Sequence, residues 1–187
     1  MSARLTREDW LDLGLRQLSA GGAEAVKLAP MLSAAKVTRG SFYHHFDDHG
    51  AFLQAMTRHW IKTQTDDLLA RLPRDAPPDA RDRALTEMAM QIDYHVELGI
   101  REVARRAPDV AAIVREADAL RLEVLTGLYA ERFGIAQDRA AMAATLEYAT
   151  YVGLILIDSE IDETAQRRLA ETYAEMMDAY FRAGKRS

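Results

Sequence analysis

The sequence predicts an all-α protein of about nine helices, and three observations lead to this expectation. Apolar residues recur at helical spacing along most of the 187 residues, no segment alternates as an exposed strand does, and glycines and prolines separate the periodic segments. Hydrophobic residues make up 49% of the chain and charged residues 28%, which suits a folded core better than intrinsic disorder. We therefore expect one or two small helical domains.

The first predicted element is an amphipathic helix over residues 6–20. Its apolar stripe consists of Leu11, Gly14, Leu15 and Leu18. Thr6 and Asp9 have the spacing of a short capping box, and Gly21-Gly22 supplies a stop signal. These signals define both ends of the helix.

Two short helices should follow. The second helix begins near Leu28, because a helix tolerates Pro30 only in its first turn. Thr38 is a suitable N-cap for a third helix, in which Phe42 and Phe46 lie one turn apart on the same face.

The remaining chain is also helical by periodicity. A long helix over residues 48–72 ends at the cluster from Pro73 to Pro78, and no internal repeat is present. Gly99, Pro108, Gly134 and a polar stretch separate the later predicted helices, which cover residues 82–94, 100–106, 109–133, 138–158 and 163–183. The apolar run 151–157 continues a helical pattern, so we expect it to be a buried helix face.

Composition limits the function classes. The chain has no cysteine, which excludes disulfides, thiolate zinc sites and cysteine nucleophiles. Residues 1–8 carry charges where a signal peptide would be apolar, and we expect no membrane-spanning run. These observations favour a soluble, cytoplasmic protein that has no membrane partner.

The charge distribution differs from the net charge. A formal charge of −5 is unusual for a nucleic-acid-binding protein, because Lys and Arg supply most non-specific affinity for phosphate. Residues 25–46, however, contain no Asp or Glu but do contain Lys27, Lys36, Arg39, His44 and His45. Such a stretch also arises by chance, so it allows a locally positive surface without establishing one.

The second and third helices have the arrangement of a helix-turn-helix. Two short helices flank a three-residue turn, and the second of them, residues 38–44, exposes polar side chains that suit a DNA major groove. Thr38, Arg39 and Ser41 can reach base edges or phosphates, while Tyr43 and His44 can donate to phosphate oxygens. Gly40 has no side chain to hold the helix away from DNA.

Residues 37–46, Val-Thr-Arg-Gly-Ser-Phe-Tyr-His-His-Phe, resemble the helix-turn-helix signature of the TetR family of bacterial regulators. The resemblance implies a homodimer that binds double-stranded operator DNA, usually as a repressor, until a small organic effector releases it. It also implies a DNA-binding domain over residues 1–47 and an effector-binding and dimerisation domain over residues 48–187. No enzymatic activity, cofactor or metal is expected.

Three positions depart from the family pattern. Lys36 occupies a turn position where glycine is usual, at a cost of about 1 kcal/mol for a left-handed backbone. Lys27 replaces a capping Ser or Thr but adds a phosphate-seeking charge. His49 stands where a lysine usually anchors phosphate. The predicted DNA contacts are therefore Lys27, Lys36, Thr38, Arg39, Gly40, Ser41, Tyr43, His44 and His49.

Two other function classes remain open. A helical metal-binding enzyme could use His45 and His49, whose i, i+4 spacing suits chelation, although they straddle a helix break. A bundle that binds proteins but not DNA is the third alternative.

The resemblance also suggests where the effector and the second copy bind. The expected effector pocket is aromatic with a few hydrogen-bonding groups, and its lining consists of Trp60, Gln64, Met88, Ile92, His95, Tyr129, Tyr148 and Tyr151. The last two helices carry apolar faces that would pair in a four-helix bundle. The expected dimer contacts are Tyr148, Val152, Gly153, Leu156, Leu169, Tyr173, Met176 and Tyr180.

Overall fold

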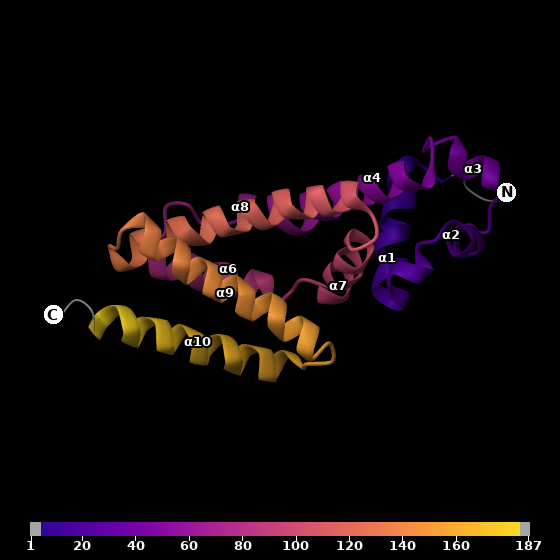
Figure 1. Ribbon diagram of the computed structural model, residues 1–187. Helices are drawn as coiled ribbons and strands as arrows, with labels where there is room; N and C mark the ends of the chain where they lie inside the picture. The colour runs from indigo at the N-terminus through magenta and orange to yellow at the C-terminus, as the bar shows by residue number, and fades with distance from the viewer. Residues whose placement is uncertain (1–4, 184–187) are drawn as a thin grey trace. The chain divides into compact units, whose positions relative to one another are not determined.

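The computed structural model describes residues 5–183, and within them every regular element is helical (Figure 1). The elements are α1 (Arg7–Ala25), α2 (Leu28–Ala35), α3 (Arg39–Tyr43), α4 (His49–Ile61), the π-helix η1 (Lys62–Asp66), α5 (Asp67–Ala70), α6 (Pro78–Ala89), α7 (Tyr94–Ala104), α8 (Pro108–Phe133), α9 (Gln137–Ile157) and α10 (Glu163–Ala183). Since α4, η1 and α5 follow one another without a break, this described part holds the nine helices that the sequence predicts.

The described residues form two compact units. Unit 1 comprises the chain up to Asp67 together with Asp93–Asp118, and unit 2 comprises Leu68–Ile92 together with the chain from Ala119 onward. Unit 1 therefore contains α1 to α4, η1, α7 and the start of α8. The predicted functional boundary between residues 47 and 48 concerns DNA contact rather than packing, and it stays a prediction.

Helix α1 begins as predicted but ends differently. Oγ1 of Thr6 accepts the backbone N–H of Asp9 at 3.1 Å, and the Asp9 carboxylate accepts the N–H of Thr6 at 2.7 Å. The predicted stop at Gly21-Gly22 is a kink, after which the helix continues to Ala25. Gly22 has φ 63° and ψ −162°, a conformation that essentially only glycine adopts without strain.

The turn between α2 and α3 has a left-handed residue. Helix α2 begins at Leu28 with Pro30 in its first turn, as predicted. Lys36 has φ 54° and ψ 41°, so a lysine takes the position that would suit glycine. Thr38 precedes α3 at the N-cap position, but its hydroxyl makes no capping hydrogen bond.

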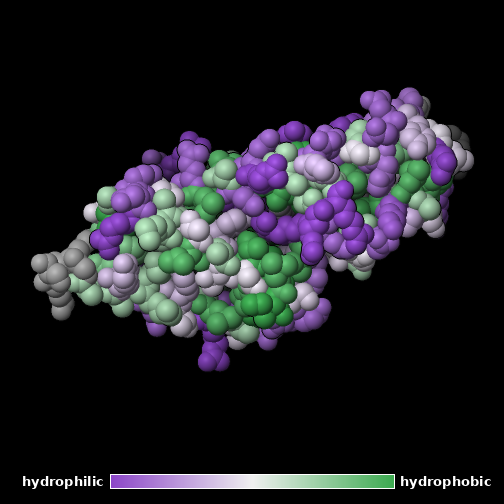
Figure 2. All heavy atoms as spheres, viewed as in Figure 1, coloured by the Kyte–Doolittle hydropathy of each residue, from purple (hydrophilic) through white to green (hydrophobic). Residues whose placement is uncertain are grey.

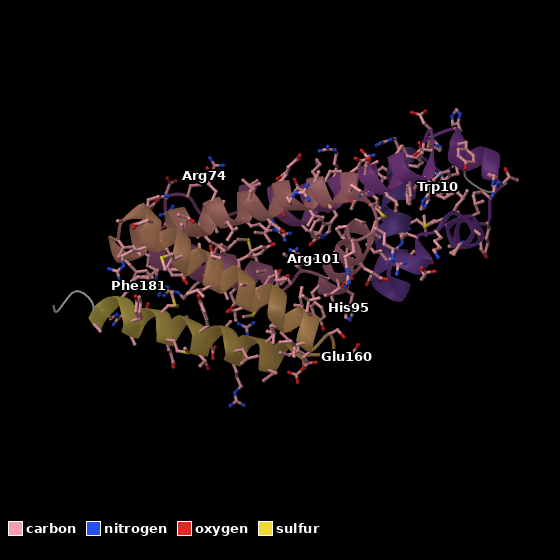
Figure 3. All side chains as sticks on the ribbon, viewed as in Figure 1. Trp10, Arg74, His95, Arg101, Glu160 and Phe181 are labelled. Atoms are coloured by element: carbon pink, nitrogen blue, oxygen red, sulfur yellow. The ribbon has the colours of Figure 1, made fainter. Side chains whose placement is uncertain are left out.

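Unit 1 is built around an aromatic core. Trp10, labelled in Figure 3, is fully buried, as is Phe42. Their rings meet edge-to-face with centroids 5.3 Å apart. The ring of Phe42 also meets that of Phe52 on α4, with centroids 5.3 Å apart. Helix α3 is therefore packed against both α1 and α4. Gly14 allows α1 and α4 to approach closely, since a Cβ there would lie 2.7 Å from Sδ of Met56.

The predicted helix break at Gly99 is wrong, because α7 runs without interruption from Tyr94 to Ala104. A Cβ at Gly99 would lie 2.4 Å from Cγ of Leu18, so the glycine permits close packing of α7 on α1. The Glu102 carboxylate accepts the N–H of Ala23 at 3.2 Å, just beyond the kink of α1. Helix α7 is thereby fixed to α1 within unit 1.

The predicted helix over residues 82–94 is shifted. Helix α6 begins earlier, at Pro78, because the first helical position needs no N–H donor, and it ends at Ala89. Tyr94 instead starts α7, whose first turn is capped by the Asp93 carboxylate accepting the N–H of His95 at 3.0 Å.

Unit 2 packs α8, α9 and α10 around a second core that contains several alanines. Its buried members are Leu125, Tyr129, Phe133, Ala140, Ala143, Ala144 and Phe181, the last labelled in Figure 3. The guanidinium of Arg132 on α8 adds a polar junction by binding three carboxylates at 2.6 to 2.9 Å, those of Asp79, Asp82 and Asp178. Because these carboxylates belong to α6 and α10, Arg132 joins three helices.

Helix α9 is the one helix of residues 5–183 that is long and apolar enough to cross a membrane. No such segment is expected from the sequence, so this finding differs from the prediction. Residues 151–157 are helical as predicted, but their predicted burial is wrong for Leu156 and Ile157, which are 62% and 88% exposed. The apolar composition of α9 thus serves an exposed face as well as the core.

Candidate nucleic-acid interface

Helix α3 buries one ring, Phe42, and exposes most of its other side chains. Because Phe42 is buried against Trp10, the other side of this five-residue helix faces outward. Most of the predicted DNA contacts lie exposed on α3 and next to it, namely Lys36, Thr38, Arg39, Gly40, Tyr43 and His44, and Ser41 is half-buried. The fold therefore gathers seven of the nine predicted contacts around one short helix.

Gly40 is not required by the packing of unit 1. A Cβ at this position would meet nothing nearer than Oγ1 of Thr38, at 3.9 Å. Gly40 also has no positive φ, so its backbone suits any residue. If glycine is needed at position 40, the reason must be a bound partner that approaches the helix closely, and not the packing of the protein itself.

Lys27 lies apart from α3 and has an intramolecular partner. Its ammonium pairs with the Glu24 carboxylate, and the hydrogen bond from Lys27 lowers the pKa of Glu24. The Arg106 guanidinium approaches the same carboxylate at 3.3 Å. The charge of Lys27 is thus partly neutralised, and its contact with DNA stays a prediction.

Asp48 caps α4, a role that the sequence reasoning missed. Its carboxylate accepts the N–H of Ala51 at 2.7 Å, while its own backbone is extended. The signal was available, since an Asp directly before a helical segment is a favoured N-cap. Asp48 thereby fixes the start of α4, six residues after the end of α3 at Tyr43.

His49 is half-buried and bonded within unit 1. Its Nε2 lies 2.8 Å from the backbone carbonyl oxygen of Val26, which can only accept, so Nε2 carries the proton and donates it. This bond leaves Nδ1 as the ring nitrogen for any phosphate. The predicted phosphate contact stays a prediction with that restriction.

The two histidines considered for metal binding have different surroundings. Nε2 of His45 is buried without a hydrogen-bond partner, whereas Nε2 of His49 binds Val26. Within residues 5–183, no group of three or more His, Asp or Glu side chains has the arrangement of a metal site.

The predicted effector lining is divided between the two units. Unit 1 contains Trp60, Gln64 and His95, and unit 2 contains Met88, Ile92, Tyr129, Tyr148 and Tyr151. Trp60 and Tyr129 are buried in the cores of their own units. Gln64 lies in η1, a π-helix of a kind that is frequent at functional sites. An effector role for these residues stays a prediction.

Exposed apolar side chains gather on α9 and α10, and Figure 2 shows hydrophobic residues over this part of unit 2. We call them the α9–α10 apolar face, which consists of Met142, Leu146, Leu156, Ile157, Leu169, Met176 and Tyr180. Four predicted dimer contacts belong to it, and sequence reasoning missed Met142, Leu146 and Ile157. Two others, Tyr148 and Tyr173, are half-buried and less available than predicted, since Tyr148 packs on the core and Tyr173 donates to the Ala143 carbonyl at 3.4 Å.

Glu147 is an acidic group that the sequence reasoning missed. Burial raises its pKa to about 7, a hydrogen bond with Tyr129 opposes the rise, and the neighbouring Asp82 carboxylate adds to it. The signal was its isolation, because Glu147 is the only charged residue between Arg139 and Asp158. A lone carboxyl group on an apolar helix is therefore placed where its ionisation is costly.

The comparison with known proteins gives a fold. No family model matches the chain, and no curated protein matches its sequence. A transcriptional regulator from Rhodococcus has a TM-score of 0.79 at 18% identity, covering 92% of this chain and 95% of its own. A regulator described as a TetR/AcrR family member has a TM-score of 0.75 at 20% identity, with 91% and 97% covered. Regulatory protein TetR from Rhodobacter sphaeroides has a TM-score of 0.73 at 21% identity, with 90% and 96% covered.

These matches show that the chain has the fold of TetR/AcrR transcriptional regulators. The resemblance that residues 37–46 carry is thus confirmed at the level of the fold. Both the all-α class and the helix-turn-helix at its N-terminal end agree with it.

Proposed function

We propose that this chain, which has the fold of the TetR/AcrR regulators, is a cytoplasmic DNA-binding transcription regulator and not an enzyme. The observation that carries the proposal is helix α3, where Arg39 and Tyr43 are exposed while Phe42 between them in the sequence is buried. Arg39 can bind a guanine edge or a phosphate, and the Tyr43 hydroxyl can donate to a phosphate oxygen. Gly40 supports close approach to DNA, since the protein itself leaves open space there.

The proposed active form is a homodimer. The α9–α10 apolar face supports it, because large apolar side chains gathered on a protein surface usually mark an interaction site. Ala149 and Gly153 lie on the same helix and are small, and a Cβ at Gly153 would meet nothing within 4 Å. A second copy would cover this face and place two α3 helices for a palindromic operator.

A small, mostly apolar organic effector would control operator binding, most simply by releasing a repressor. The aromatic and hydrogen-bonding character of the predicted lining supports an organic molecule. An effector that binds best to the conformation unable to bind DNA lowers the affinity for the operator. Because binding of the two ligands is linked, bound DNA must lower the affinity for the effector by the same factor.

Selection from a random-sequence duplex library tests the proposal. Wild type should enrich a palindromic duplex, and Arg39→Ala should bind that duplex more weakly by about 1 to 3 kcal/mol at fixed salt with an unchanged helical spectrum. The matched control is Arg74→Ala, in the segment between α5 and α6. Failure to enrich any duplex would favour a bundle that binds proteins only.

A further inference from the structure

Two histidines of α4 bind the α1 side of unit 1 through Nε2. His49, at the start of α4, bonds the carbonyl oxygen of Val26 at 2.8 Å, directly after α1. Nε2 of His59, near the end of α4, lies 2.7 Å from Oδ1 of Asp12 in the second turn of α1. The His59 side chain is only 13% exposed, whereas that of Asp12 is 48% exposed. The two bonds show that α4 runs antiparallel to α1.

Between these two bonds, the contact of α1 with α4 is apolar. Gly14 gives no side chain, and a Cβ there would lie 2.9 Å from Phe52 and 2.7 Å from Met56. Side-chain packing sets the distance between two helices and restricts their crossing angle. Hydrogen bonds are directional, so a bond at each side of the apolar contact further restricts the angle and register of α4 on α1.

Both bonds keep their donors when the imidazoles change protonation state. A carbonyl oxygen and a carboxylate accept, so Nε2 of both His49 and His59 carries the hydrogen in the neutral form, and it also does so in the cation. A lysine at position 49 would place its charge on a flexible stem and could not reproduce this fixed geometry. The histidine is therefore suited to holding a helix as well as to meeting phosphate.

The position of α4 affects α3 through edge-to-face contacts between aromatic rings. The ring centroid of Phe52 on α4 lies 5.3 Å from that of Phe42 on α3 and 5.1 Å from that of Phe46. Since Phe42 turns the polar side of α3 outward, a change in the angle of α4 would change how α3 is presented.

We propose that His49 and His59 are positioning residues that hold α4 on α1 at the angle at which α3 enters the major groove. The inference rests on the proposed function, since it concerns operator binding. It also assigns His49 a role inside the protein that does not depend on the phosphate contact suggested by the sequence pattern.

Operator affinity tests the inference, with the duplex selected by wild type as the probe. His49→Leu and Asp12→Ala should each weaken binding about tenfold, as expected for loss of one directional hydrogen bond. His49→Gln should recover much of the affinity, because its amide can donate to Val26. The salt dependence should not change, whereas loss of a phosphate contact lowers the salt slope by about 1. Arg74→Ala is the control, since Arg74 lies in unit 2, in the segment between α5 and α6, and takes no part in the contact of α4 with α1.

The outcomes separate the inference from the proposed function. Tight wild-type binding with His49→Leu and Asp12→Ala unchanged would overturn the inference alone, and a loss for His49→Leu with a lower salt slope would return His49 to phosphate contact. A wild type that selects no duplex would contradict the proposed function, and the inference with it. Long-range proton–nitrogen NMR on the DNA-free protein should show Nε2–H for His49 and His59, and the Nδ1–H form in either would overturn its assigned bond.

Discussion

Units 1 and 2 use apolar residues in different ways. Unit 1 buries large aromatic rings such as Trp10 and Phe42, and its helices are joined by directional bonds from His49 and His59. Unit 2 buries the rings of Tyr129, Phe133 and Phe181 beside several alanines, but it also directs large apolar side chains outward. Within residues 5–183, the exposed large hydrophobic side chains are Tyr43 on α3 and the seven members of the α9–α10 apolar face. Unit 1 therefore leaves few large apolar side chains in solvent, whereas unit 2 exposes an apolar face that a second copy would cover in the proposed dimer.

Charge sharpens the same comparison. In unit 2, Arg132 binds the carboxylates of Asp79, Asp82 and Asp178, and the half-buried Glu147 interacts electrostatically with Asp82 and Arg132 of this junction. An acidic group with a raised pKa makes the folded state more costly once the group must ionise. Unit 2 should therefore be the pH-sensitive part of the molecule.

The largest expected effect comes from Glu147→Gln. The folded pKa of Glu147, about 7, exceeds its ordinary value of 4.5, so folding stability is highest below about pH 4.5 and falls as pH rises to about 7. Above that pH, the glutamine variant should be more stable by up to about 3 kcal/mol. Urea unfolding across this pH range measures the difference.

The control for this prediction is Glu171→Gln, on an exposed position of α10. Its stability should follow the wild-type pH dependence. If the wild type and Glu147→Gln show the same pH dependence, the carboxyl group of Glu147 is not in the environment described.

A pair of glycine substitutions gives the next largest effect. Gly99→Ala should destabilise the protein by about 1 to 3 kcal/mol, because its Cβ would meet Leu18 at 2.4 Å in the tightly packed seam of unit 1. Gly153→Ala should not destabilise the folded chain, since its Cβ meets nothing and alanine favours a helix. Thermal unfolding of both variants checks the contrast, and equal losses would contradict it.

Gly40→Ala should have the smallest effect on the protein and a selective one on DNA. The free energy of unfolding should stay within about 1 kcal/mol of wild type, because alanine is favoured over glycine in helices. Affinity for the selected duplex should fall if α3 lies close to DNA. Fluorescence anisotropy of a labelled duplex measures this, and undiminished affinity would argue against close approach.

Local signals were readable from the sequence. The Thr6–Asp9 capping box and the start of α2 near Pro30 each depend on a few neighbouring residues, whereas the left-handed turn at Lys36 was expected from the resemblance to the family pattern. Such features follow from backbone geometry, which is why they could be predicted.

Features that depend on distant partners were not readable. Gly99 was interpreted as a helix break because its contact, Leu18, lies far away in the sequence. The bond from His49 to Val26 joins residues 23 positions apart, and no periodicity reports it. The exposure of Leu156 and Ile157 on α9 was not predicted, because a helix whose only charged residue after Arg139 is Glu147 shows little amphipathic contrast.

The stoichiometry of the protein–DNA complex tests the central claim most directly. Light scattering of wild type with its selected palindromic duplex should give two chains per duplex, with α3 of each chain in one half-site. Gly153→Arg, which places a large charged side chain on α9, should yield monomers that bind the same duplex weakly. A wild type that stays monomeric at micromolar concentration, or that forms no complex with any duplex, would contradict the account.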